Sequence, residues 1–174
     1  MDYIISSMDL LLKPSYCIFL VIVFFLFLLV GSKAGKRANR IPLSLLGTYT
    51  GLIFLATLIV RTTNHESYKL IPFWSYYEII VHHDMILFWE DLLNVAMMLP
   101  VGFLLPAAFR QIQLRTVLII AIAMECFIEI MQFVFERGLA EWDDVIHGAI
   151  GTLIGYGLFK MFISVRRACT GLDK

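Results

Sequence analysis

Residues 125–151 read ECFIEIMQFVFERGLAEWDDVIHGAIG, and this stretch decides the fold. It starts inside one apolar run, leaves that run at Glu136, and enters a second run after Asp144. Carboxylates inside a long apolar run are costly, so their positions need a physical reason. The pattern predicts two helices joined by a short turn, which together form a helical hairpin.

Polar and small residues lie on one side of each predicted helix. At about 100° per residue, four residues of the first helix fall within an arc of about 60°. These residues are Glu125, Glu129, Gln132 and Glu136. The same spacing on the second helix selects Asp144, Gly148, Gly151 and Gly155. We expect these two stripes to face each other, with the functional site between them. Close helix packing is the plainer explanation for the glycines.

The composition excludes an ordinary soluble domain. The chain has 174 residues, of which 60% are hydrophobic and 16% are charged, whereas soluble domains carry about 25% charged residues. The formal net charge is zero, so nucleic acid is not an expected partner. Three separate cysteines, Cys17, Cys126 and Cys169, show no disulfide or metal-ligand spacing and are interpreted as packing residues.

Five apolar runs predict an all-α membrane protein with about five transmembrane helices. The runs are approximately 15–30, 42–60, 88–109, 116–135 and 144–163. The first is interpreted as a retained anchor because its basic cluster follows it. We divide the chain into an anchor helix with a basic cytoplasmic loop (1–41), a membrane domain (42–163) and a cytoplasmic tail (164–174). The segment 61–87 is interpreted as a long polar connection.

The basic residues indicate an orientation. Most Lys and Arg residues fall in three places that alternate helices bring to one side: Lys33, Lys36, Arg37 and Arg40; Arg110 and Arg115; Lys160, Arg166, Arg167 and Lys174. The positive-inside rule makes this side cytoplasmic, with the N-terminus outside and the C-terminus inside. The opposite side is rich in acidic residues, and we expect it to face outward.

Polar side chains converge near this outer side and form the candidate cleft. The candidates are Arg61, Asp91, Asn94, Glu129, Gln132, Arg137, Asp143, Asp144 and His147. Ionisable residues within membrane helices are candidates for function by default. Such a cleft would bind a polar or lipid-linked ligand, and membrane lipids are expected partners.

Three alternatives remain open at this stage. The same residues could be polar groups that only hold the bundle together or bind a partner. Paired carboxylates could also perform acid–base catalysis on a lipid-linked precursor or phospholipid. A small transporter is less favoured because no inverted repeat is visible. No cofactor motif or metal motif such as HExxH occurs, and the pair His82-His83 is interpreted as loop residues.

Four motifs in order resemble the VanZ-like membrane proteins of bacteria. They are Arg61 followed by Leu70–Phe73; Asp91 and Asn94 running into Leu99–Pro106; Glu129 and Gln132 with Arg137; and Asp143–Ile146 followed by Gly148 and Gly151–Tyr156. The resemblance covers about residues 42–160. The family pattern usually has Asn at the position of His147, and a histidine can titrate as well as form hydrogen bonds.

The resemblance implies a multi-pass protein of the bacterial plasma membrane. It further implies a link to low-level glycopeptide resistance, with teicoplanin and lipoglycopeptides affected more than vancomycin. A lipoglycopeptide or a lipid-linked envelope precursor is therefore the expected ligand, and binding is favoured over catalysis.

Overall fold

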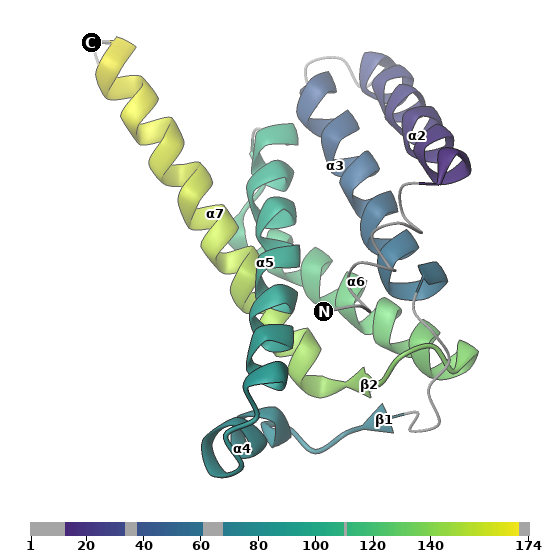
Figure 1. Cartoon of the computed structure of the whole chain (residues 1–174). Coiled ribbons are helices and arrows are strands. Elements are labelled where there is room, and N and C mark those ends of the chain that lie inside the picture. The colour runs from purple at the N-terminus through teal and green to yellow at the C-terminus, as the bar shows by residue number, and fades with distance from the viewer. Residues whose placement is uncertain (1–12, 34–37, 61–67, 110, 171–174) are drawn as a thin grey trace.

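The computed structural model describes residues 13–33, 38–60, 68–109 and 111–170. The elements in chain order are α2 (Pro14–Lys33), α3 (Arg40–Phe54), the π-helical η2 (Leu55–Val60), β1 (Tyr68–Lys69), α4 (Trp74–Val81), α5 (Met85–Ala108), α6 (Leu114–Phe135), β2 (Ala140–Glu141) and α7 (Trp142–Thr170). Figure 1 shows these helices as one bundle with a small two-stranded sheet at one end.

The apolar runs form the long helices, as predicted. Within the described residues, five helical segments are long and apolar enough to cross a membrane. Many large apolar side chains on these helices are exposed, including Ile22 and Leu29 on α2 and Ile119 on α6. Exposed apolar side chains are compatible with the hydrocarbon core of a bilayer, because that core is itself apolar and contains no water. The prediction of a multi-pass helical membrane bundle is therefore confirmed.

The segment 61–87 differs from the prediction of a polar connection. Its described part contains β1 and the helix α4, which lies beneath the start of α5 (Figure 1). β1 pairs in parallel with β2, so that Tyr68 is opposite Ala140. Helix α4 was missed because eight residues are too few to show a clear helical period.

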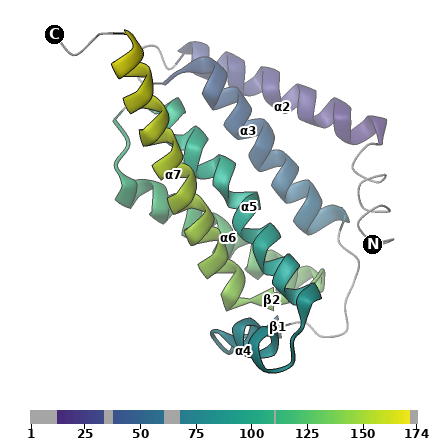
Figure 2. The same cartoon turned by 60° about the vertical axis from the view of Figure 1, so that its left-hand side comes forward.

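Successive long helices run in opposite directions, which gathers most of the described basic residues at one end, whereas Lys69 and Arg137 lie toward the other. α2 ends where α3 begins, and α5 and α7 end on the same side (Figures 1 and 2). Lys33, Arg40, Arg115 and Arg166 accordingly lie toward this end. The sheet and α4 lie at the opposite end. Which end faces the cytoplasm remains a prediction.

Helices α5 and α7 form the central pair, and they are held unusually close by glycines. A Cβ atom added at Gly151 would overlap the carbonyl oxygen of Val95, and one at Gly155 would overlap that of Leu99. Gly102 of α5 meets the backbone of Thr152 in the same way. The interpretation of these glycines as packing residues is thus supported by the contact.

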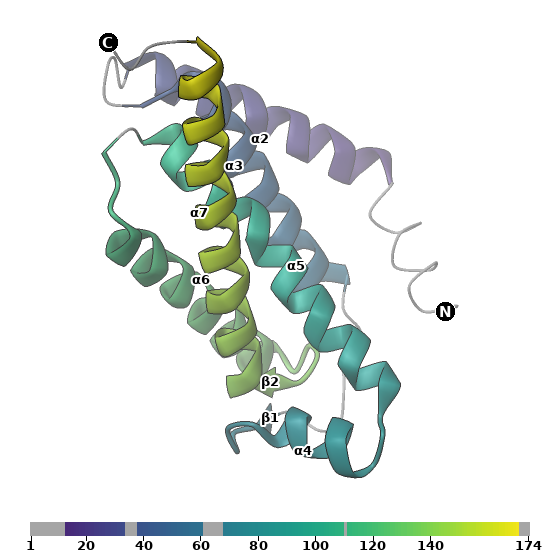
Figure 3. The same cartoon turned by 90° about the vertical axis from the view of Figure 1, so that its left-hand side faces the viewer.

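The two polar stripes of the expected hairpin meet only in part. Glu125 is buried and contacts Gly148, as expected. Gly151 and Gly155, however, face α5 instead of α6, and Glu136 is exposed at the end of α6. Sequence neighbours were assumed to be the closest packing partners, whereas α7 packs mainly on α5 (Figure 3).

Helix α5 continues through Pro100 and Pro106 without ending. Two side chains, one in α3 and one just before it, donate hydrogen bonds to carbonyl groups of α5. The hydroxyl of Tyr49 donates to the Met97 oxygen at 2.8 Å, and the Asn39 amide donates to the Ala107 oxygen at 2.7 Å. These bonds fix α3 against α5, and the second one satisfies one of the last four carbonyls of α5, which have no partner within the helix.

Replacement of Gly151 by Ala should destabilise the bundle, because the new methyl group would meet backbone that cannot move aside. We expect a loss of about 1–3 kcal/mol, as for other overpacked sites. Gly157 is the matched control on the same helix, since a Cβ there meets nothing within 4 Å. Gly157→Ala should leave stability unchanged or raise it slightly through helix propensity. Thermal unfolding in detergent measures both, and equal midpoints would contradict the packing role.

Candidate functional site

The polar residues at the sheet end are placed by the start of α7, which brings two buried side chains against α4 and against a third buried group on α5. Asp143 and His147 are 0% and 3% exposed, and Asp91 of α5 is 9% exposed. The Nε2 atom of His147 lies 2.9 Å from the hydroxyl oxygen of Tyr76 on α4 and 3.6 Å from Asp91 Oδ2. The predicted meeting of Asp91, Asp143 and His147 therefore occurs.

Tyr76 connects α4 to His147. Burial raises the pKa of the Tyr76 phenol above its usual range, and the nearby carboxylates of Asp91 and Asp143 raise this pKa further. The phenol therefore keeps its proton. Its hydroxyl oxygen and His147 Nε2 share one hydrogen bond, whose donor is set by the imidazole tautomer. His147 Nδ1 is buried and has no hydrogen-bond partner among the described residues.

Asp143 holds the first turn of α4. Its Oδ1 accepts from the Phe73 amide at 2.6 Å, and its Oδ2 accepts from the Ser75 amide at 3.0 Å and the Ser75 hydroxyl at 2.9 Å. The N-cap residue Phe73 has φ 63° and offers no capping side chain of its own. A carboxylate from α7 thus performs the capping that a local Ser or Asp would normally provide.

Asp144 points toward the other neighbours of α7. Its Oδ1 accepts from the side-chain amide of Asn94 on α5 at 2.5 Å. Glu125 lies on the α6 side of this region, against Gly148, and is 2% exposed. The polar contacts thus continue from α5 through α7 to α6, and they bring Asp144 and Asn94 together as predicted.

Three further candidates lie at the end of α6, where each has a backbone partner. Glu129 Oε2 accepts from the Glu141 amide at 2.7 Å. The side chain of Gln132 donates to the Thr57 oxygen at 3.4 Å, and Arg137 Nη1 donates to the Ile59 oxygen at 2.9 Å. Gln132 and Arg137 therefore connect the end of α6 to η2, the π-helical segment that follows α3. The candidate Arg61 lies outside the described residues.

The open space at this end is an apolar groove beside the polar cluster. It has a volume of about 560 Å³ and lies between α6, the sheet and the first turn of α7. Its apolar walls include Leu70, Cys126, Ile130 and Phe133, and its polar lining comes from the residues Glu129 and Glu141. Of the eight predicted site residues that the structure describes, Glu129 is the one that lines it.

Sequence reasoning missed several residues that shape this end. The ring of Trp74 lies under Lys69 Nζ, 3.7 Å from the ring centroid, and Trp74 Nε1 donates to Glu141 Oε2 at 2.9 Å. Ser75 and Tyr76 supply the α4 side of the polar cluster. The run Phe73–Tyr77 after Pro72 was the available signal, but from sequence alone it is interpreted as part of the long polar connection 61–87.

Within the ranges that the structure describes, no group of three or more His, Cys, Asp or Glu residues is arranged to hold a metal ion.

The fold and this polar end define a multi-pass helical membrane protein with buried ionisable residues at one end of its bundle. The chain belongs to the VanZ/LLP1 family, whose pattern it matches over residues 15–163. The resemblance noted from the four motifs is thus confirmed, and the match includes α2. Neither the curated proteins nor the solved structures gave a match.

Replacement of Asp143 by Ala should release α4, because the Phe73 and Ser75 donors would lose their shared acceptor. Burying unsatisfied donors costs about 1–3 kcal/mol. We expect faster amide hydrogen exchange across residues 73–81, with the α5–α7 contact retained. Glu90→Ala is the control, because Glu90 is exposed on α5 near the same end. Unchanged exchange in Asp143→Ala would contradict the capping role.

Proposed function

We propose that this chain is a bacterial plasma-membrane protein that binds a lipidated or lipid-linked envelope ligand in the groove beside α6 and α7. Binding at this site would lower susceptibility to teicoplanin and lipoglycopeptides more than to vancomycin. The proposal follows the VanZ/LLP1 membership, and the groove is the observation that carries it. The proposed ligand site is therefore the apolar groove, which lies beside the polar cleft predicted from the sequence.

The composition of the groove favours a ligand with an apolar tail. A pocket of about 560 Å³ falls within the usual range for small-molecule sites. Its walls are apolar side chains of α6 and α7, whereas Glu129 and Glu141 stand at a polar edge. An acyl chain could lie against Ile130 and Phe133 while a polar head met the carboxylates. Vancomycin lacks such a tail, which would explain a preference for teicoplanin.

The buried cluster supports the groove instead of opening into it. Asp91, Asp143 and His147 do not line the groove, and their described contacts connect α4, α5 and α7. Asp143 and Glu129 both act on segments next to the groove, at Ser75 and Glu141 respectively. We infer that these residues set the shape of the ligand site through the α4 and β2 segments.

The direct test fills the groove. In Cys126→Trp the new ring would occupy the space between α6 and α7, so protection against teicoplanin should fall to the level of cells carrying empty vector. Ile120→Trp is the matched control, because Ile120 is 39% exposed on α6 and lies outside the groove. Susceptibility to teicoplanin and vancomycin is measured at equal membrane levels. Equal protection by both variants would exclude the groove as the ligand site.

Binding can also be followed without a resistance phenotype. In a Cys17→Ser, Cys169→Ser background, Cys126 is the remaining thiol, and it is partly exposed in the groove wall. Teicoplanin should slow its reaction with a thiol reagent, whereas vancomycin should not.

A second comparison measures lipid-linked precursors and phospholipids in cells with and without the gene. A changed precursor composition would favour the enzymatic alternative.

A further inference from the structure

The end of the bundle opposite the sheet contains a second and larger groove. It has a volume of about 1050 Å³ and lies between the start of α3, the end of α5 and the outer half of α7. The close α5–α7 contact extends to Gly155, and a Cβ added at Gly157 would meet nothing within 4 Å. Beyond this point α7 diverges from the bundle, as Figure 1 shows, and the groove occupies the space that remains.

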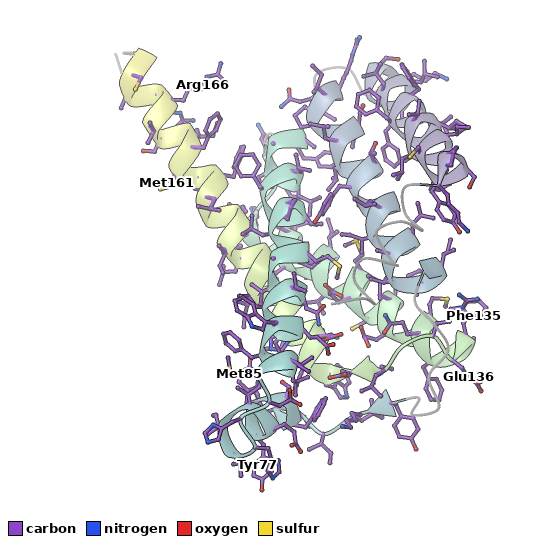
Figure 4. All side chains as sticks on the ribbon, in the orientation of Figure 1. Tyr77, Met85, Phe135, Glu136, Met161 and Arg166 are labelled. Carbon is purple, nitrogen blue, oxygen red and sulfur yellow. The ribbon has the colours of Figure 1, made fainter. Side chains whose placement is uncertain are left out.

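Four basic residues line this groove, contributed by two elements far apart in sequence. Arg40 begins α3, and Lys160, Arg166 and Arg167 lie on α7. All four side chains are exposed, and Figure 4 shows Arg166 on the outer part of α7. Among the described residues, the lining contains no Asp or Glu. The described lining therefore carries a net positive charge that comes from two helices.

Other walls of the same groove are apolar. Phe159, Phe162 and Ile163 of α7 line the groove together with Pro106 of α5. Phe103 of α5 braces the two phenylalanines, with ring centroids 5.6 Å from Phe159 and 6.1 Å from Phe162. Arg40, Arg166 and Arg167 thus lie toward the ends of their helices, whereas Lys160 lies between Phe159 and Phe162 on α7.

We propose that this groove binds an anionic phospholipid, whose phosphate contacts Arg40, Lys160 and Arg166 while its acyl chains lie against Phe159 and Phe162. Basic pockets between membrane helices are suited to anionic headgroups. The apolar wall distinguishes this ligand from free phosphate, which would gain nothing from Phe159 or Phe162. The site is at the opposite end from the ligand groove and does not depend on the function proposed for that groove.

Lipid binding is measured on the purified full-length protein by native mass spectrometry. Phosphatidylglycerol should bind more tightly than phosphatidylcholine with the same acyl chains. The variant Arg40→Gln, Lys160→Gln, Arg166→Gln should lose most of this preference, since each charge contributes about fivefold near an anionic lipid surface. Inorganic phosphate should not displace the lipid.

The control removes two basic residues at the same end that do not line the groove. Lys33 and Arg115 are both exposed there, so Lys33→Gln, Arg115→Gln should keep the full preference for phosphatidylglycerol. Unfolding in detergent verifies that each variant folds, and the single variant Arg166→Gln replaces the triple one if it does not. Equal binding of both lipids, equal losses in the control, or displacement by inorganic phosphate would each overturn the proposal.

Discussion

The close contact between α5 and α7 is the constraint on which the other features depend. Glycines at 102, 151 and 155 let the two backbones touch, and the contact fixes the position of α7 along α5. The same contact therefore sets the position of the first turn of α7. From that place Asp143 reaches the amides of α4, and Asp144 reaches the side chain of Asn94. A larger residue within the contact would therefore disturb polar groups several turns away.

The sequence predicted the helices and much of the polar cluster because both follow from local patterns. Apolar runs define the spans, and carboxylates within such runs stand out against the cost of burying charge. Asp91 and His147 were expected to meet, and Asp91 Oδ2 lies 3.6 Å from His147 Nε2. The predicted site differed where its geometry depends on tertiary partners. No periodicity shows that Asp143 caps a helix 70 residues earlier, or that Gln132 and Arg137 bind carbonyls of a π-helical turn.

The two ends of the bundle differ in how they are closed. At the sheet end, hydrogen bonds connect each short element to a long helix or its end. Asp143 accepts from α4, Glu129 accepts from β2, and Arg137 donates to η2. At the other end α7 leaves the bundle, and its outer half contributes Lys160 and Arg166 to an open basic groove. One helix thus takes part in a tightly bonded end and an open one, with Gly155 near the point of change.

The capping of α4 by Asp143 has a consequence for biosynthesis. The Phe73 amide and its acceptor are 70 residues apart in the chain, and the ribosome adds about 5–20 residues per second. The first turn of α4 therefore leaves the ribosome several seconds before the carboxylate that completes it. Until the start of α7 has been synthesised and placed, α4 lacks this acceptor, so the sheet end cannot be completed before that point.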